Sequence, residues 1–142
     1  MKKVLLIILS MIIVPVCAET FDTFDNDFNR TSTIRKTPNG NYELFDEDMN
    51  NVGRIRQYSN GNGVMYDQNW NTVGRFRTSP SDQTHVFDPN GNKVGTFKQL
   101  SGGRAYTYDN YGNRTGSFRT FPGGRGVMTD NFGNIRGSFR AR

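Results

Sequence analysis

Hydrophobic and polar residues alternate over short stretches between clusters of turn residues along most of this chain. In the clearest stretch, from Thr84 to Phe97, two such runs flank Asp88-Pro89-Asn90-Gly91. Asp, Pro and Gly at the first, second and fourth positions are typical of a type I turn. β-Branched and aromatic residues flank the turn, and no stretch shows the 3.6-residue apolar period of a helix. The pattern therefore predicts β-hairpins.

The hairpin unit recurs every 21 residues from Phe24 to Arg142, without an insertion or deletion. Its fixed positions are an aspartate at the turn and a glycine seven residues later: Asp46, Asp67, Asp88, Asp109 and Asp130, and Gly53, Gly74, Gly95, Gly116 and Gly137. We assign these residues a structural role in the repeat. A sixth, degraded copy begins the array, with Asp25 and Ser32 at the two positions, as a terminal capping repeat would. The copies are bounded at about 22–38, then 39–59, 60–80, 81–101, 102–122 and 123–142.

Turn chemistry also predicts a register between strands. If Asp88 and Asn92 close the hairpin, Phe87 faces Lys93 and Val86 faces Val94. If Tyr58 and Gly63 close the link to the next hairpin, Ile55 faces Tyr66. Because side chains alternate between the faces of a strand, this register collects the large rings and the glycines on one face. It places on that face His85, Phe87, Gly95 and Phe97.

Six hairpins give twelve strands, and open twisted sheets rarely exceed about 10 strands without curling. We predict an all-β fold, an antiparallel meander of six 21-residue hairpin repeats curled into a closed array. A barrel, a rosette of hairpins and a short superhelical stack remain as alternatives. An outer-membrane barrel is not expected, because the predicted strands of about 6–7 residues are shorter than the 9–11 residues needed to span a bilayer.

The first eighteen residues differ from the rest and predict a secretory signal peptide, 1–18. Met1-Lys2-Lys3 precedes an apolar run from Val4 to Val16, and Ala18 supplies the small residue at the cut. The single cysteine, Cys17, raises a lipoprotein alternative, but the residues before it are a poor match to a lipidation signal. We expect a single domain, 19–142, without disulfides or a membrane span. The dilysine signal looks bacterial, so we predict a periplasmic or secreted protein.

The stretch from Tyr106 through Asp109, Gly112 and Asn113 to Gly116 resembles the tyrosine–aspartate repeats of the Rhs family. The stretch from Phe87 to Phe97 is similar to small exported bacterial proteins described as five-fold β-flowers. Both resemblances cover most of residues 22–142 and imply arrays of β-hairpins. Neither implies a catalytic residue.

One base per repeat follows the turn aspartate by ten residues and forms a candidate binding column: Arg35, Arg56, Arg77, Lys98, Arg119 and Arg140. Such a column could bind an anionic polymer such as lipopolysaccharide, another acidic glycan or a nucleic acid. The alternative is solvated strand charge that prevents aggregation and pairs with the aspartates of the next repeat. The predicted register would then bring Arg54 near Asp67, and Arg75 near Asp88.

Aspartate and asparagine alternate at the turns as in calcium loops, but the twelfth position is Lys36, Gln57, Thr78 or Gln99 rather than glutamate. We therefore expect the turn aspartates to accept amide hydrogen bonds and predict no metal and no cofactor. The only histidine, His85, is replaced by other residue types in the other copies, which does not suggest catalysis. Trp70 and Tyr111 at hairpin tips are candidate contact residues for a glycan or a protein.

The sequence predicts a non-enzymatic repeat module that acts in binding or in the structure of the cell envelope. The alternative is a binder of anionic glycans or lipopolysaccharide that uses the basic column. The expected partner is an envelope protein or an anionic polysaccharide rather than a nucleic acid.

Overall fold

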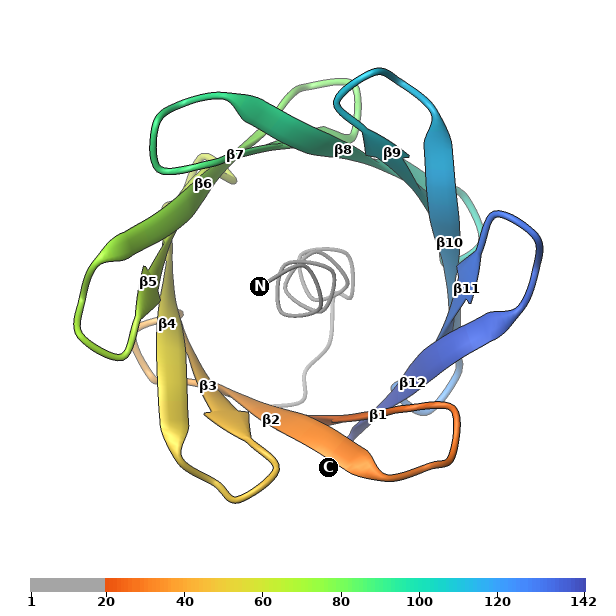
Figure 1. The fold of residues 1–142 in the computed structure, drawn as a ribbon, viewed down its shortest axis with the longest axis horizontal. Helices are drawn as coiled ribbons and strands as arrows, with labels where there is room; N and C mark the ends of the chain where they lie inside the picture. The colour runs from red at the N-terminus through yellow and green to blue at the C-terminus, as the bar shows by residue number, and fades with distance from the viewer. Residues whose placement is uncertain (1–19) are drawn as a thin grey trace.

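The computed structural model describes residues 20–142 and confirms an all-β antiparallel meander closed into a barrel (Figure 1). Each strand pairs with its neighbours in the chain, and β12 pairs with β1. The strands are β1 Thr20–Phe24, β2 Arg30–Lys36, β3 Tyr42–Asp46, β4 Asn51–Gln57, β5 Gly63–Asp67, β6 Thr72–Thr78, β7 Gln83–Phe87, β8 Lys93–Leu100, β9 Arg104–Asp109, β10 Arg114–Phe121, β11 Arg125–Asp130 and β12 Ile135–Ala141. The predicted signal peptide lies outside the described residues.

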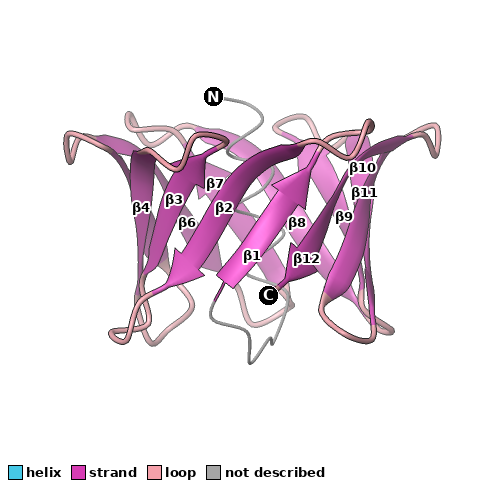
Figure 2. Cartoon of the chain, turned by 90° about the horizontal axis from the view of Figure 1, so that it is seen from below, coloured by secondary structure: helices cyan, strands magenta, loops and turns pink. Residues whose placement is uncertain are grey.

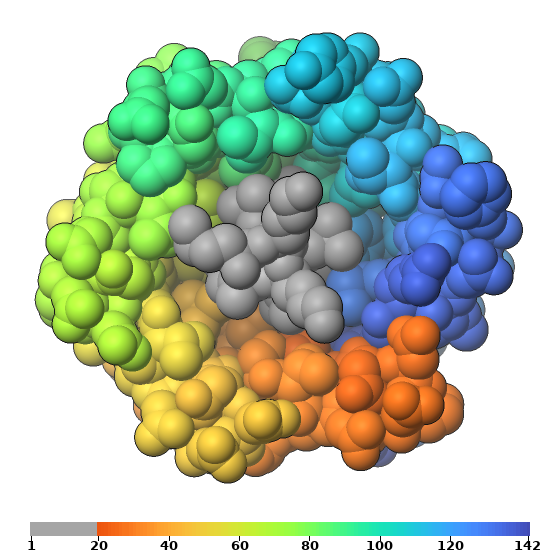
Figure 3. All heavy atoms as spheres, in the orientation of Figure 1, coloured from red at the N-terminus to blue at the C-terminus, as the bar shows by residue number. Residues whose placement is uncertain are grey.

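The barrel has two different ends. Turns within a repeat, such as Asp67–Asn71, form one end, which we call the turn end; links between repeats, such as Tyr58–Asn62, form the link end. Figure 2 shows that the loops of the turn end spread further outward than those of the link end. In Figure 3 the six repeats lie side by side around the ring. Because the repeats have equal length, equivalent residues lie at equivalent heights along the barrel.

The turns and the first two links have the same hydrogen bonds. In a turn, the Asp67 N–H donates to the Asn71 carbonyl at 3.0 Å and the Trp70 N–H donates to the Asp67 carbonyl at 3.2 Å. In a link, the Tyr58 N–H donates to the Asn62 carbonyl at 2.8 Å and the Gly61 N–H donates to the Tyr58 carbonyl at 3.1 Å. The fourth residue is left-handed in both, with φ 66° at Trp70 and 81° at Gly61. Both are therefore the three-residue hairpin loop with a left-handed closing residue.

This shared loop corrects the predicted register of the links. Tyr58 is closed by Asn62 rather than by Gly63, so Ile55 pairs with Met65 and not with Tyr66. The same one-residue shift pairs Phe76 with Val86. A one-residue shift moves every side chain of a strand to the other face.

The hairpins contain a second correction. Phe87 pairs with Lys93 as predicted, but a bulge then shifts the ladder, so Val86 pairs with Gly95 rather than with Val94. The extra residue of a bulge leaves two residues on one strand opposite one on its partner. His85 and Phe87 therefore lie on the face opposite Gly95 and Phe97, which contradicts the predicted single aromatic face.

The buried face of the sheet carries one large or small apolar residue from each strand and forms the core, which faces the barrel axis. Its members are Phe21, Ile34, Leu44, Ile55, Met65, Phe76, Val86, Phe97, Ala105, Phe118, Met128 and Phe139. Glycine allows large rings to lie flat on this face. A Cβ atom at Gly63 would overlap the Phe76 ring, and one at Gly126 would overlap the Phe139 ring.

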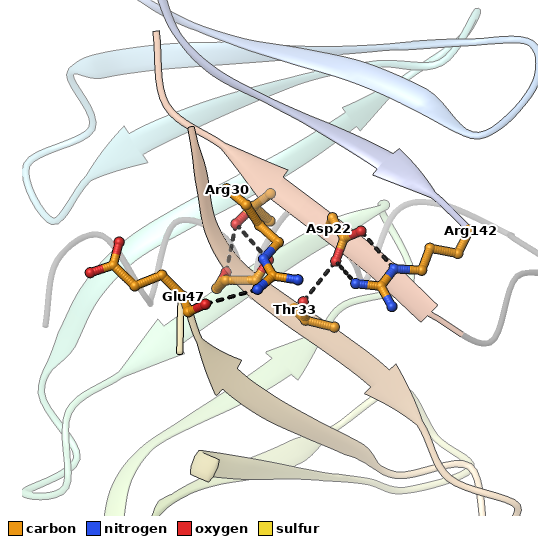
Figure 4. A network of polar contacts seen from close by, with 7 residues as sticks. Asp22, Arg30, Thr33, Glu47 and Arg142 are labelled. Atoms are coloured by element: carbon orange, nitrogen blue, oxygen red, sulfur yellow. Dashed lines mark hydrogen bonds and ion pairs between the residues drawn. The ribbon is translucent and has the colours of Figure 1, made fainter. Parts of the chain in front are cut away.

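Besides the β1–β12 ladder, an ion pair between β1 and Arg142, the residue that follows β12, holds the barrel closed (Figure 4). Arg142 donates from Nε to Asp22 Oδ2 at 2.6 Å and from Nη2 to Asp22 Oδ1 at 2.8 Å. The Thr33 hydroxyl donates to Asp22 Oδ1 at 2.7 Å. A two-pronged guanidinium–carboxylate pair fixes geometry as well as charge, so it orients the terminal strand against β1 and β2.

Candidate functional site: a basic and aromatic belt

The six bases of the column lie on alternate strands, from β2 to β12, and all are exposed on the outer face. Each lies near the link end of its strand, one or two residues before the strand gives way to the link. Since the repeats are equivalent by rotation about the barrel axis, the bases encircle the barrel at one height. We call Arg35, Arg56, Arg77, Lys98, Arg119 and Arg140 the basic belt.

Aromatic rings lie beneath most of the belt. The guanidinium carbon is 4.7 Å from the ring centroid in Arg35–Phe45, 5.7 Å in Arg56–Tyr58, 5.7 Å in Arg77–Phe87, 5.3 Å in Arg119–Phe121 and 5.8 Å in Arg140–Phe24. These distances fall within the range of cation–π contact. Phe87, which the predicted register placed on the aromatic face, is one of these rings, and together they form an outer platform that orients the cations.

One belt residue also has a carboxylate partner. The Arg35 guanidinium donates to Glu43 Oε2 at 3.1 Å, with 54% of the Arg35 side chain exposed. Exposed ion pairs of this kind contribute little to stability.

The predicted pairing of Arg54 with Asp67, and of Arg75 with Asp88, is wrong. Arg54 instead lies over the Trp70 ring at 4.4 Å, and Arg75 Nη1 donates to the Pro89 carbonyl at 3.5 Å. The reason is the register, since Arg54 pairs with Tyr66 on β5 and Arg75 pairs with Phe87 on β7. Asp67 pairs with Gly53 instead.

Charge is divided between the two ends of the barrel. The link end adds to the belt the bases Lys36, Arg104, Arg125 and Arg142. The turn end carries four bases, Arg30, Lys93, Arg114 and Arg136, against the acids Asp25, Asp27, Asp46, Glu47, Asp48, Asp67, Asp88, Asp109 and Asp130, and Asp82 lies in a link. Among residues 20–142, most of the acids therefore lie at the turn end and most of the bases at the link end.

The turn aspartates accept three hydrogen bonds each within their own loop. Asp109 Oδ1 accepts from the N–H groups of Tyr111 at 2.9 Å and Asn113 at 2.8 Å, and Oδ2 accepts from the Asn113 amide at 3.1 Å. The Asn113 N–H and then its side-chain amide hold the pKa of Asp109 below its usual value. The same contacts recur at the turns of Asp25, Asp46, Asp67, Asp88 and Asp130.

Other candidate chemistry is sparse in residues 20–142. Within this part of the chain, no three side chains of His, Cys, Asp or Glu are grouped as metal ligands would be. His85 lies on the outer face, where its Nδ1 and the Thr96 hydroxyl are 3.1 Å apart. No helix among these residues has the length and apolarity that crossing a bilayer requires.

The tips of the turn end carry more apolar side chains than the two candidates predicted from the sequence. Trp70 and Tyr111 are exposed as candidate contacts, and Phe28, Met49 and Phe132 join them. Five of the six turns therefore present a large apolar side chain to solvent. The sequence contains the signal for these exposed tips. A large apolar residue occupies the third or fourth position of the turn in every copy except the one with Pro89.

Comparison of the chain with protein-family models and with curated proteins finds no match.

Proposed function

We propose that this protein is an exported, non-enzymatic binding module whose basic belt holds an anionic polysaccharide. The observation that carries the proposal is the stacking of five belt arginines on outward-facing rings. A stacked guanidinium loses less rotamer freedom when it binds an anion, because the aromatic platform already limits its motion. The face of each cation away from the ring stays available to sulfate, carboxylate or phosphate groups.

The arrangement suits a polymer better than a small ligand. Neighbouring belt residues lie on alternate strands, and adjacent strands are about 4.8 Å apart. Successive cations are therefore separated by about two strand spacings, which an extended chain of charged sugars can follow. The acids of the turn end would repel the same polymer and confine it to the link half of the barrel.

Heparin affinity chromatography tests the proposal with an anionic polysaccharide of known composition. The variant Arg56→Glu/Arg77→Glu reverses two belt charges, and we expect it to elute at clearly lower salt than the wild type. Lys93→Glu/Arg114→Glu is the matched control, because it changes net charge equally but near the turn end. We expect the control to shift the elution much less.

Equal shifts in the two variants would show that net charge, rather than the belt, governs retention, and the proposal would fail. Loss of the fold is checked by circular dichroism of both variants. Beads coated with lipopolysaccharide then show whether a bacterial envelope glycan binds with the same dependence on Arg56 and Arg77.

The exposed tips support a second candidate function, an envelope scaffold that binds a protein. Phe28, Tyr111 and Phe132 are each more than four-fifths exposed, which is unusual for large rings without a partner. A pull-down from envelope extract separates the two functions by showing whether protein or polysaccharide is retained. Replacing Tyr111 and Phe132 by serine should abolish capture of a protein but leave heparin elution unchanged.

A further inference from the structure

A groove crosses the outer wall where the barrel closes, over β11, β12 and β1; we call this the closing groove. Its volume is about 320 Å³, at the lower end of the range for small-molecule sites. Phe24, Phe28 and Phe121 line it with aromatic rings, and Val127 and Ser138 also line it between these rings. Two bases, Arg125 and Arg140, lie at its side, and Gly126 and Phe139 complete the lining.

Comparison with the other five junctions between repeats explains why the groove forms here. At the junction of the second and third repeats, Arg54 occupies the position of Ser138 and lies over Trp70, the counterpart of Phe28. The position of Val127 is occupied by Tyr106 in the preceding copy. At the junction of the fifth and sixth repeats, Thr129 and Gly133 also occupy the positions that Phe24 and Phe28 have at the closing junction. The closing junction alone combines small side chains at the centre with three phenylalanines around them.

The two bases form an unusual pair. Arg125 and Arg140 are directly opposite each other on β11 and β12, and like charges in that arrangement repel. Asp22 is opposite Arg140 on β1, but both of its carboxylate oxygens are held by Arg142. An anion bound between the two guanidinium groups would relieve their repulsion.

We propose that the closing groove binds an anionic amphiphile, a molecule with a short alkyl or acyl chain and a phosphate or carboxylate head. The chain would lie over Val127 and Ser138 between the phenylalanine rings, where burial of apolar surface favours binding. The head would bind Arg125 and Arg140, whose guanidinium groups can donate paired hydrogen bonds to phosphate or carboxylate.

This inference is independent of polysaccharide binding by the belt, although Arg140 belongs to both. Val127→Tyr blocks the groove and leaves every base in place. The barrel should accept this substitution, because Tyr106 occupies the equivalent position one repeat earlier. Failure of the groove proposal and failure of the belt proposal can therefore be distinguished by comparing probe binding with heparin elution in this one variant.

Isothermal titration with octyl phosphate, below its micelle concentration, tests the proposal. We expect octyl phosphate to bind at least about tenfold more tightly than either of two controls, which corresponds to about 1.4 kcal/mol. Octyl glucoside has the alkyl chain without the charge, and inorganic phosphate has the charge without the alkyl chain. Octanoate is the second probe and shows whether a carboxylate head serves as well as phosphate.

Two variants locate the probe. Val127→Tyr should weaken octyl phosphate binding at least about tenfold while heparin elution stays as in the wild type. Arg125→Gln/Arg140→Gln should remove the preference for octyl phosphate over octyl glucoside. Octyl phosphate binding that is unchanged by Val127→Tyr, or matched by inorganic phosphate, would overturn the proposal, and so would the absence of any binding.

Discussion

The left-handed residue of each hairpin turn differs between the two halves of the chain. It is Phe28, Met49 or Trp70 in the first three repeats and glycine in the last three. A residue with a side chain pays about 1–3 kcal/mol for this backbone conformation, whereas glycine adopts it readily. We expect Met49→Gly to stabilise the protein by about 1 kcal/mol, because relief of the backbone strain outweighs the partial burial of a side chain that is 44% exposed. Urea unfolding measures the change.

The reciprocal substitution is the control for this effect. Gly91→Met places a side chain at φ 88° in the fourth repeat and should destabilise the protein by a similar amount. If Met49→Gly is instead destabilising, Met49 contributes a contact that outweighs its backbone strain.

A glycine on the core face is needed for a different reason, the close approach of backbone. A Cβ atom at Gly116 would lie 2.5 Å from the Thr129 carbonyl oxygen, so β10 and β11 would have to separate. We expect Gly116→Ala to destabilise the protein by about 1–3 kcal/mol, as overpacked cores do. Chemical unfolding compares it with Asn110→Ala on an exposed turn, where the change should stay within about 0.5 kcal/mol. Equal effects would show that the strands absorb the methyl group.

Among the elements, the hairpin turns make stability depend on acid pH. Despite desolvation, hydrogen bonds from Asn134 and Arg136 lower the pKa of Asp130 to about 2, and the pKa values of Asp46, Asp67, Asp88 and Asp109 are also lowered. A carboxyl with a lowered folded-state pKa contributes stability above its unfolded value of 3.8. That contribution is lost as the pH falls through the folded-state pKa values. We therefore expect thermal stability to fall between about pH 4 and pH 2.

Asp109→Asn identifies the turns as the source of this acid dependence. It removes the charge that accepts the Asn113 amides, so the variant should be less stable than the wild type at pH 7. The two proteins should converge as the pH falls below the lowered folded-state pKa of Asp109, where the wild-type carboxyl is protonated as well. A difference that persists there would assign the loss to altered loop geometry instead of charge.

The strands also show where reasoning from the sequence fails. Repeat length and turn residues were sufficient for the hairpins, the meander and its closure, because these depend on local chemistry and on strand number. The faces of Phe45, Tyr66 and Phe87 were wrong, because a bulge beyond each turn and a three-residue link each shift the register by one residue. Either shift inverts a strand, and neither is specified by the alternation of apolar and polar residues alone.

At the scale of the whole molecule, the belt could be predicted from the sequence but the closing groove could not. The belt follows from one base per repeat on equivalent strands. The groove needs Phe24 and Phe28 from the first repeat beside Val127 and Ser138 from the last, and only closure of the barrel brings them together. Positions that look like random drift within a repeat become a specific surface once the ends of the chain meet.

Closure also predicts that the order of the repeats along the chain can be changed. The Arg142 N–H donates to the Thr20 carbonyl at 2.9 Å, so the ends of the barrel are adjacent and a short linker can join them. A circular permutant of residues 20–142 that is cut in the exposed link at Pro80–Ser81 retains all twelve strand pairings. We expect the same circular dichroism spectrum as that of the unpermuted protein and a cooperative thermal transition.

A permutant cut within β6, between Arg75 and Phe76, should fail to fold, because the break divides a strand at its core residue. If both permutants fold equally well, the β12–β1 closure and the intact strands are not what holds the barrel together.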